Sequence, residues 1–399
     1  MTLGFVTPKL HALRDQFRAD GFDIRLVGGC VRDWLAGHEP KDIDLCTNAY
    51  PDEQIALYQK LGIRFIPTGY DHGTITVVLD DKPYEITSLR LDVATDGRRA
   101  TVAYTRDWLE DLKRRDLTIN AMSMDFEGKL FDPFNGAEHL KEGIVKFVGN
   151  PNKRIQEDYL RILRWFRFQV RFGIADTAKM QKSAAGRAIS RHKDGLKKIS
   201  KERIWSEIKA LLQHENGPLM LAVMDHLGVG ECIGMPAKVK PQSRLASVYA
   251  ARKALEWSGS PEVIIAAWFG WYEPDVLTIA NDWKWSNAEK EHFYWLLRHG
   301  WLGCDLRRLI AVHNAPREWV RELAYWEGRD EWEKTALVEW VFPPFPVNGN
   351  DLIAHGIKPG KIMGVIINTL KDKWAASGYS ATKDDLMQMV IDMDHEHND

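Results

Sequence analysis

The chain has 399 residues, of which 45% are hydrophobic and 28% are charged, and its formal net charge at pH 7 is −2. This length is two to three times that of a usual domain, and the composition is too apolar for a disordered protein. The net charge argues neither for nor against a nucleic-acid partner, so the local distribution of charge has to decide.

Nothing in the sequence predicts a membrane or secreted protein. The longest apolar run, residues 263–272, is about half as long as a bilayer-spanning helix, and the N-terminal residues do not form a signal peptide. The cysteines include no C-x-x-C pair, which is typical of a reducing compartment; they are Cys30, Cys46, Cys232 and Cys304. We therefore expect a cytoplasmic protein with no membrane partner, and we infer no protein partner.

Two large enzyme classes are disfavoured because their motifs are missing from the sequence. The G-x-x-x-x-G-K-[ST] motif of P-loop NTPases is absent, and so is the G-x-G-x-x-G motif of dinucleotide-binding folds. Phosphate binding, if present, has to use another arrangement of glycines and cations.

The first 150 or so residues alternate short strand-like runs with helices. Residues 24–27 and 43–47 are predicted strands. Residues 74–79 and 84–88 alternate polar and apolar side chains about a turn at 80–83, which predicts a hairpin. This pattern predicts an α/β domain with a mixed sheet.

Beyond residue 152 the pattern becomes helical. Apolar residues recur at helical spacing in 155–172, 200–213 and 218–227, and amphipathic stretches continue toward the end of the chain. The proline-rich segment 342–346 interrupts this pattern and separates a last helical unit. The expected fold class is therefore α+β, with an N-terminal mixed sheet and an all-α remainder.

Positive charge is concentrated in residues 151–210, which contain 16 lysines and arginines against 6 acidic residues. Such a block is typical of a surface that follows a phosphate backbone, although a solvated helical face has the same composition. Twelve of the 16 tryptophans lie after residue 250. They either stack on bases or, as we prefer because their spacing is irregular, pack helices together.

Two aspartates lie in the second predicted strand. Because side chains alternate along a strand, Asp42 and Asp44 are expected to project to one side while Ile43 and Leu45 pack on the core. Adjacent carboxylates repel each other unless a cation lies between them, and Mg²⁺ prefers such oxygen ligands when nucleotide phosphates complete its shell. Asp-x-Asp by itself is also common in surface turns.

The preceding segment, LVGGCVRD at 26–33, runs from a strand through two glycines into a helix. Gly28 and Gly29 allow backbone N–H groups to approach a triphosphate, and Arg32 adds a fork-shaped donor for a phosphate oxygen. A Gly-Gly turn is usually only a turn. When an arginine and then Asp-x-Asp follow the turn, the pattern favours binding of a phosphate and a metal ion.

These segments resemble the nucleotidyltransferase superfamily that includes DNA polymerase β. RRDLTINAM at 114–122, DPFNG at 132–136 and EDYLR at 157–161 follow in the order of its class II branch, the tRNA CCA-adding nucleotidyltransferases and bacterial poly(A) polymerases. The matching motifs cover roughly residues 25–210. The resemblance implies a polymerase-β-like head followed by a helical neck, body and tail, with the ranges 1–150, 151–215, 216–341 and 342–399.

The resemblance also implies roles for single residues. Asp42 and Asp44 match the metal-binding pair, and Glu85 lies where the family has a third catalytic carboxylate, although strand glutamates are commonly only solvated. Arg203 matches a position that braces helices. The matches to nucleotide contacts are Gly29 and Arg32 for the triphosphate, Arg115 and Asp116 for the nucleotide and its ribose side, Asp158 and Arg161 for the incoming base, and Arg164 and Arg167 for further contacts on the same helix.

Asp158 and Arg161 are a chemically plausible pair for reading a base. The predicted helix 157–172 would place them one turn apart. Cytosine and adenine both present an amino donor beside a ring-nitrogen acceptor, whereas uracil and guanine present the reverse. A carboxylate only accepts and a guanidinium only donates, so the pair would match C and A without a template.

The implied activity is the addition of C, C and A to the 3′ end of tRNA from CTP and ATP with Mg²⁺. Residues 91–105, with Asp92, Asp96, Arg98 and Arg99, resemble the flexible loop that full CCA-adding enzymes keep. The alternatives are a poly(A) polymerase, against which the neutral to acidic C-terminal part argues, and a partial CC- or A-adding enzyme. A more distant alternative is a non-catalytic RNA-binding protein that kept the fold.

Overall fold

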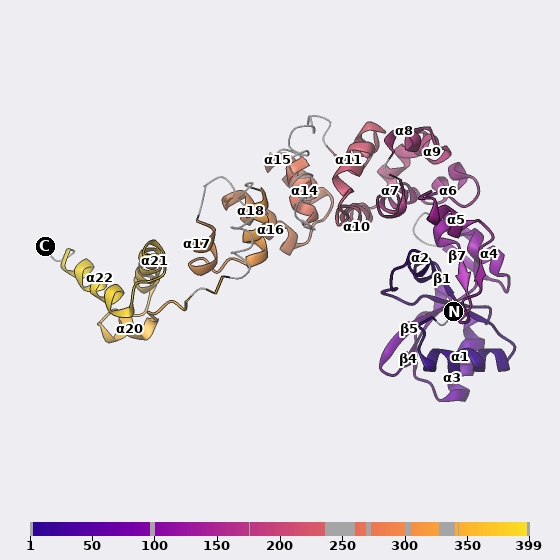
Figure 1. The fold of residues 1–399 in the computed structure, drawn as a ribbon, viewed down its shortest axis with the longest axis horizontal. Helices are drawn as coiled ribbons and strands as arrows, with labels where there is room; N and C mark the ends of the chain where they lie inside the picture. The colour runs from indigo at the N-terminus through magenta and orange to yellow at the C-terminus, as the bar shows by residue number, and fades with distance from the viewer. Residues whose placement is uncertain are drawn as a thin grey trace. The chain divides into compact units, whose positions relative to one another are not determined.

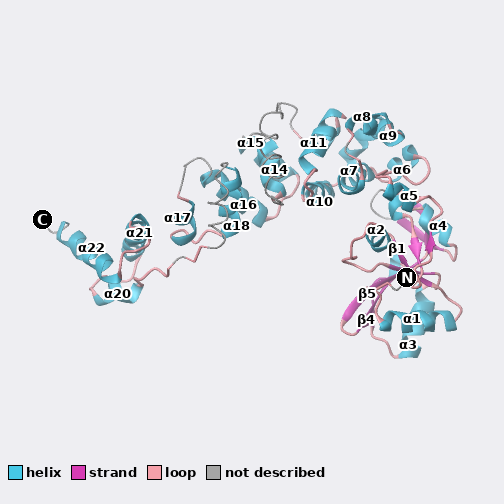
Figure 2. Ribbon diagram, viewed as in Figure 1, coloured by secondary structure: helices cyan, strands magenta, loops and turns pink. Residues whose placement is uncertain are grey.

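The structure is a computed structural model that describes residues 3–95, 100–174, 176–235, 260–268, 273–299, 305–326, 340–341 and 343–396. Its strands lie in the N-terminal part and the remainder of the described chain is helical (Figures 1 and 2). This confirms the expected α+β class. Contacts divide the chain into two units, which are Met1–Gln242 with Pro274–Trp285, and Ser243–Glu273 with Ser286–Asp399.

The first unit is built on a seven-stranded mixed sheet. Its spatial order is β3-β4-β5-β2-β1-β8-β9, and all neighbours are antiparallel except the parallel pair β2 and β5. The strands are β1 (Ile24–Val27), β2 (Leu45–Thr47), β3 (Phe65–Gly69), β4 (Thr74–Leu79), β5 (Lys82–Ser88), β8 (Ser123–Met124) and β9 (Leu130–Phe131).

The first strand and the presence of the hairpin are confirmed, but the second strand of the hairpin begins at Lys82, two residues earlier than predicted. The two-residue turn between β4 and β5 consists of Asp80 and Asp81, whose φ angles of +48° and +61° are those of a type I′ hairpin turn, which aspartate tolerates. The predicted strand 43–47 is wrong at its start. It begins at Leu45, so Asp42 and Asp44 lie in the segment that leads into β2.

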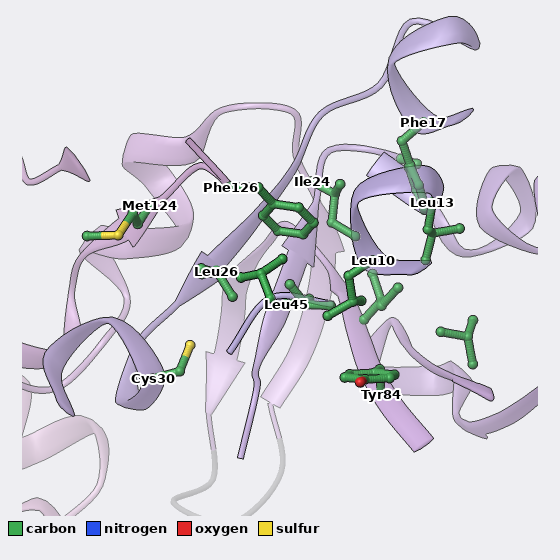
Figure 3. Packing of buried hydrophobic residues seen from close by; sticks show 14 of the residues in the cluster. Leu10, Leu13, Phe17, Ile24, Leu26, Cys30, Leu45, Tyr84, Met124 and Phe126 are labelled. Atoms are coloured by element: carbon green, nitrogen blue, oxygen red, sulfur yellow. The ribbon is translucent and has the colours of Figure 1, made fainter. Parts of the chain in front are cut away.

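The core of this unit lies between the sheet and two helices, α1 (Pro8–Ala19) and α3 (Pro51–Leu61). Leu10, Leu13 and Phe17 of α1 pack on Ile24 and Leu26 of β1, and all are almost fully buried (Figure 3). Thr7 accepts a hydrogen bond from Leu10 N, which caps α1 at its start. Burial of each such side chain contributes about 1.5–3 kcal/mol, so this core holds β1 and β2 in place for the site.

A second, two-stranded sheet consists of β6 (Arg90–Thr95) and β7 (Ala100–Tyr104). The two strands pair antiparallel from Arg90 with Tyr104 to Thr95 with Ala100. The predicted flexible loop 91–105 therefore corresponds to this hairpin. Asp96, Arg98 and Arg99 lie outside the described residues, as does the side chain of Asp92.

The helical part of the first unit begins after the sheet. Asn150 caps α6, and α11 begins with glycine and proline, which suits a first helical turn. Two helices of the sheet region are α2 (Gly29–Leu35) and α4 (Trp108–Lys113). The helices that follow are α5 (Gly136–Lys141), α6 (Pro151–Glu157), α7 (Arg161–Phe172), α8 (Thr177–Lys182), α9 (Ala184–His192), α10 (Lys201–Leu212), α11 (Gly217–His226), α12 (Val229–Ile233) and α15 (Glu273–Asp282).

The predicted single helix 155–172 is wrong. It is divided into α6 and α7, because Asp158 adopts an extended backbone conformation with φ −154° and ψ 109°. The Asp158 carboxylate accepts a hydrogen bond from Leu160 N at 3.0 Å, and this competing local bond turns the chain before α7 starts at Arg161. Asp158 and Arg161 are therefore not on one continuous helix.

In the described residues of the second unit, the regular secondary structure consists of helices. The unit contains a buried group of titratable side chains, in which His292 lies 3.0 Å from both Glu262 and Glu322 and stacks on Trp319. The helices are α14 (Pro261–Trp268), α16 (Asn287–His299), α17 (Leu306–Ala311), α18 (Arg317–Trp326), α20 (Gly349–Ala354), α21 (Lys361–Ala376) and α22 (Lys383–Glu396).

The tryptophans that the structure describes in the C-terminal half support the interpretation that these side chains pack helices together. Trp268, Trp283, Trp285 and Trp374 are at most 3% exposed. Trp283 and Trp285 both pack on Trp205 of α10, with ring centroids 5.7 and 5.0 Å away. Trp257, Trp271, Trp301 and Trp332 lie outside the described residues.

In the part of the chain that the structure describes, no helix combines the length and the apolar character needed to cross a bilayer. The four-part division into head, neck, body and tail stays a prediction, since contacts resolve two units.

Candidate active site

Three predicted acids gather at the end of the sheet. Asp42, Asp44 and Glu85 all line one cavity of about 850 Å³. Glu85 lies on β5, and the parallel register that sets Leu45 beside Ile86 brings Glu85 to the position next to Asp44. The parallel pairing of β2 and β5 therefore assembles carboxylates that are 41 to 43 positions apart in the chain.

Asp44 lies close enough to Asp42 and Glu85 for their charges to act on it. The pKa of Asp44 is raised above its usual value, first by partial desolvation and then by Asp42 and Glu85, although Arg115 opposes this. No hydrogen bond or ion pair to a cationic side chain is found for the three carboxylates within the described ranges.

The donor set fits a divalent cation. Among the described residues, no group of three or more His, Cys, Asp or Glu side chains is arranged to enclose a metal ion. Mg²⁺ in nucleotide-dependent enzymes is usually held by one or two carboxylates together with substrate phosphates. Asp42 and Asp44, with Glu85 beside them, offer oxygen ligands of this type and a negative field that a cation would neutralise.

Two glycines keep the space beside these acids open. A Cβ at Gly28 would lie 2.6 Å from Arg115 Nη1, and its φ of +66° is a conformation that other residues rarely adopt. A Cβ at Gly29 would lie 3.8 Å from Asp44 Oδ2 and 3.7 Å from Arg32 Nη2. The Gly-Gly turn thus admits Arg115 and faces the gap between an acid and an arginine.

Arg32 is held in a defined orientation by contacts on several sides. Its Nη1 donates to Asn120 Oδ1 at 2.5 Å and its Nε donates to Asp33 Oδ1 at 2.9 Å. The guanidinium lies 5.0 and 4.9 Å from the ring centres of Phe168 and Phe172 on α7. Burial lowers the pKa of Arg32, an effect that Asp33 opposes, but a guanidinium keeps its charge in proteins. The helix after Asp158 therefore helps to orient an arginine of α2.

Arg115 is held by an acid that sequence reasoning missed. Its Nη2 donates to Asp111 Oδ2 at 3.3 Å, and Asp111 is fully buried on α4. Asp111 Oδ1 also accepts from Arg114 Nε at 2.9 Å and from the backbone N of Arg90, where β6 begins. The spacing of four residues between Asp111 and Arg115 was the available signal, although α4 ends at Lys113 and Arg115 follows it.

The pKa values support this arrangement. Burial tends to raise the pKa of Asp111, but Arg115 and Arg114 outweigh it and hold the pKa below its usual value. Desolvation tends to lower the pKa of the half-buried Arg115 guanidinium, but Asp111 opposes this effect and the pKa is raised. The pair is therefore ionised on both sides.

A second acid, Asp116, holds an arginine of α7. Arg164 Nε donates to Asp116 Oδ2 at 2.6 Å, and this contact lowers the pKa of the buried Asp116 carboxyl against its desolvation. Arg167 Nε donates to Glu207 Oε2 at 2.6 Å. Asp116 thus positions Arg164, and Arg167 is bound to α10.

The two residues expected to read the base are paired with other side chains. Asp158 Oδ2 accepts from Arg203 Nη2 at 2.8 Å. Arg161 Nη1 donates to Glu157 Oε2 at 2.5 Å, and its Nη2 donates to the carbonyl of Arg114 at 3.3 Å. Arg203, expected only to brace helices, therefore contacts a residue of the site.

A second cavity, of about 400 Å³, brings most of the predicted nucleotide contacts together. It shares Asp44 with the larger cavity, and its arginines give it a positive character. Arg167 is not part of its lining. The residues that line it are Gly28, Gly29, Arg32, Asp44, Arg114, Arg115, Asp116, Asn120, Asp158, Arg161, Arg164 and Phe168.

Part of the basic block 151–210 is used inside the protein. Lys193 Nζ donates to the carbonyl of Leu227 at 3.2 Å, and Lys201 Nζ donates to the carbonyl of Ile233 at 3.1 Å. Both lysines therefore cap the C-terminal ends of helices. Lys197 pairs with an acid three residues earlier.

Comparison with known proteins places the chain in a family. A family model described as "Poly A polymerase head domain" matches residues 24–146, and one described as "Probable RNA and SrmB- binding site of polymerase A" matches residues 185–233. The protein "CCA tRNA nucleotidyltransferase 1, mitochondrial" of Mus musculus is 37% identical over 401 residues, which cover 96% of this chain and 90% of that protein. The chain belongs to the family of CCA-adding tRNA nucleotidyltransferases.

Other members of this family match over almost their whole length. The "CCA-adding enzyme" of Lactobacillus helveticus is 30% identical, and the alignment covers 97% of this chain and 96% of that protein. The crystal structure of the Bacillus stearothermophilus CCA-adding enzyme in complex with CTP has a TM-score of 0.75 at 25% identity, covering 98% of this chain and all of that one. The resemblance stated from the motifs is confirmed, and membership of this nucleotidyltransferase family implies dependence on a divalent metal ion.

Proposed function

We propose that this chain adds C, C and A to the 3′ end of tRNA, using CTP and ATP and releasing pyrophosphate. The observation that carries the proposal is the meeting of two cavities at Asp44, one lined by carboxylates and the other by arginines. A tRNA as the acceptor follows from the names of the related proteins.

The reaction is a displacement at phosphorus. The 3′ hydroxyl of the RNA loses its proton to solvent as its oxygen forms a bond to the α-phosphorus. The bond from that phosphorus to the bridging oxygen breaks, and its electron pair leaves with pyrophosphate. Asp42 and Asp44 would hold Mg²⁺, with Glu85 beside them, and a metal there would stabilise charge on the attacking and leaving oxygens. The protein contributes by positioning the two substrates and by stabilising the charge that develops during the reaction.

The arginine-lined cavity suits the triphosphate. Arg32 is oriented by Asn120 and two aromatic rings, and Gly29 leaves open the space between Arg32 and Asp44. Arg115, held by Asp111, adds a second fixed cation. Arginines that are already oriented lose little conformational freedom when they bind phosphate.

Base choice is proposed for Asp158 and Arg161, with Asp116, Arg164 and Arg167 in support. The acceptor of Asp158 and the donors of Arg161 match the Watson–Crick edges of C and A and oppose those of U and G. In the structure these side chains are bonded to Arg203 and Glu157. A base that binds here therefore shares these side chains with Arg203 and Glu157 or displaces those partners.

The decisive test is incubation of tRNA lacking its 3′ CCA with CTP, ATP and Mg²⁺. We expect two C residues and then one A. A long A-ladder formed without CTP would indicate a poly(A) polymerase, addition that stops after C or needs a preformed CC end would indicate a partial enzyme, and no incorporation would indicate an RNA-binding protein.

The proposed location is the cytoplasm. Because the relative in Mus musculus is named as mitochondrial, fractionation of cells that express the full natural chain should decide between the two compartments.

A further inference from the structure

The turn that carries Asp158 is docked on one other segment of the chain. The Asp158 carboxylate accepts a hydrogen bond from Arg203 in the first turn of α10. The side chain of the next residue, Tyr159, is half-buried and contacts Gly195 in the 3₁₀ helix η3 (Lys193–Lys198). The segment 195–203 therefore contacts two successive residues of the turn.

The tyrosine ring is the reason that position 195 has no side chain. A Cβ at Gly195 would lie 2.0 Å from Cδ1 of Tyr159, 2.1 Å from Cε1 and 2.4 Å from Cγ. Carbon atoms that are not bonded to each other are in favourable contact at about 3.5–4.0 Å, so the ring occupies the place of this Cβ. Gly195 does not have a positive φ angle, and its backbone would accept an L-residue such as alanine. The glycine is thus required by the ring and not by the backbone.

The segment that receives the ring is itself held in place. Leu196 is fully buried, and its carbonyl accepts a hydrogen bond from Ile199 N at 3.0 Å. Lys193 at the start of η3 donates to the carbonyl of Leu227, and Trp205 of α10 is buried. Close-packed interiors resist small displacements, so a ring that packs on this segment restricts the backbone of the turn.

The two contacts differ in what happens to them when a base binds. The bond from Arg203 uses the Asp158 carboxylate, so a base that binds this carboxylate shares it with Arg203 or displaces Arg203. The contact between Tyr159 and Gly195 uses no polar atom of Asp158. It therefore persists when the hydrogen bonds of Asp158 change, and it keeps the turn in place while the carboxylate is engaged.

Resting on the proposed function, we propose that Tyr159 and Gly195 are positioning residues for base selection, because the ring packed on the glycine holds the turn 158–160 and with it the Asp158 carboxylate. Asp158 lines the arginine-lined cavity, whereas Tyr159 and Gly195 do not. They act through Asp158 without touching the nucleotide. Since a misplacement of about 1 Å at a reacting or reading group can cost as much as 10²-fold in rate, a methyl group at position 195 is enough to weaken the reading of the base.

The first test compares a displaced ring with a retained one. Gly195→Ala should lower kcat/KM for CTP and ATP by about 10-fold or more and reduce their advantage over UTP and GTP by a similar factor. Tyr159→Phe keeps the ring and should keep the wild-type preference. The matched control is Gly217→Ala, which introduces the same methyl group 2.7 Å from the carbonyl oxygen of Leu211, at the end of α10 away from Arg203. It should lower the melting temperature and leave the preference unchanged.

A double variant tests whether the effect is steric. In Gly195→Ala combined with Tyr159→Ala the methyl group meets no ring, so it should add little to the effect of Tyr159→Ala alone. The inhibition constant of pyrophosphate reports on the arginines that suit the triphosphate, and it should stay within about twofold of wild type in every variant. Simple additivity, or a loss of pyrophosphate binding equal to the loss of base preference, would overturn the inference.

The second test does not depend on activity. The amide of Leu160 donates to Asp158 Oδ1 at 3.0 Å, so its exchange with deuterium reports whether the turn is intact. Exchange is followed by mass spectrometry of peptides that contain Leu160, in the full chain without nucleotide. It should be about 10-fold faster in Gly195→Ala than in wild type, and unchanged in Tyr159→Phe and Gly217→Ala.

The inference is overturned if folded Gly195→Ala keeps the full preference for CTP and ATP, or if its Leu160 amide exchanges at the wild-type rate. Should this variant melt below the assay temperature, Tyr159→Ala replaces it, because it removes the ring without a clash and should also weaken the preference. Failure of the proposed function is distinguishable. Wild-type protein would then incorporate no nucleotide, while exchange at Leu160 still reports whether the ring holds the turn.

Discussion

In the described part of the chain, the acidic side chains at the end of the sheet have no cationic partner, whereas the charged side chains at the junction between α6 and α7 are each paired with a side chain of opposite charge. Asp42, Asp44 and Glu85 have no cationic partner through a hydrogen bond or ion pair in the described ranges. At the junction, by contrast, Asp158 is bonded to Arg203 and Arg161 to Glu157.

This difference indicates two ways in which charged side chains are arranged before a ligand binds. Unpaired acids hold a negative field that favours a cation from solution, and they cost stability because like charges repel. Paired charges keep their side chains in place, and a ligand that needs them competes with a protein partner or shares the side chain with it. Mutations at the sheet end should therefore affect catalysis with little effect on folding, whereas mutations at the junction should affect both.

The largest effect is expected at the unpaired acids. Asp42→Ala and Asp44→Ala should each lower kcat by about 10³-fold or more, since charge on the reacting oxygens loses its stabilisation. The melting temperature and the affinity for tRNA should hardly change. Single-turnover incorporation of CTP measures this, with Asp71→Ala, which removes an exposed acid outside both cavities, as control. Retention of more than about a tenth of wild-type activity would remove the pair from the mechanism.

At the junction, Asp158→Ala should lower kcat/KM for CTP and ATP together and reduce their advantage over UTP and GTP, which we expect to be about 10²–10⁴-fold in wild type. Arg203→Met removes the partner of Asp158 without removing the acceptor, so it should lower stability but keep the preference. Measurement of kcat/KM for all four nucleotides in both variants tests this. If the preference for CTP and ATP survives in Asp158→Ala, then Asp158 does not read the base and has a structural role together with Arg203.

A smaller effect is expected at the acid that holds Arg115. Asp111→Asn should raise KM for CTP and ATP by about 10–100-fold, because one charged hydrogen bond no longer orients the guanidinium. Asp107→Asn, which changes the N-cap of the same helix, is the matched control. In a double-mutant cycle Asp111→Asn should add little to Arg115→Met, and simple additivity would show that the acid does not act through Arg115.

A paired group away from the site should respond to pH. Glu262 and Glu322 raise the pKa of His292 to about 9 against the effect of its burial. Since the pKa in the folded state exceeds that of the unfolded state, the stabilisation is complete below about pH 6.5 and is lost as the pH rises through about 9. The free energy of unfolding of wild type relative to His292→Gln, measured with denaturant, should fall by something on the order of 2 kcal/mol over that interval, and a constant difference would contradict the charged state.

The smallest effect concerns the basic block. Arg187 and Arg191 of α9 are exposed and bond to the carbonyl of Lys182 and to Asn152, not to an acid. Charge reversal of each should lower the salt dependence of tRNA binding by about one unit of log–log slope, if they contact RNA phosphates. Lys193→Met should instead lower the melting temperature, because Lys193 caps a helix end. Equal slopes for all three variants would place the RNA elsewhere.

The sequence determined what depends on local geometry and on the order of motifs. Strand β1, the hairpin with Asp80 and Asp81, and the glycines before α2 follow from short-range rules of turn chemistry and alternation. The family could also be recognised, because each motif is a short run of residues and the motifs follow one another in a fixed order. Asp42, Asp44 and Arg32 were found in this way, because metal and phosphate chemistry restrict residue type.

The tertiary structure decided which charged groups meet. Helical spacing predicted one helix through Asp158, but the bond from Leu160 N to its carboxylate and the contact with Arg203, 45 residues away, divide it into two. The parallel pairing of β2 and β5 brings Glu85 to Asp44, and the fold turns Lys193 inward to a helix end. Long-range ion pairs depend on how whole elements pack, and a local pattern of charges does not encode that packing.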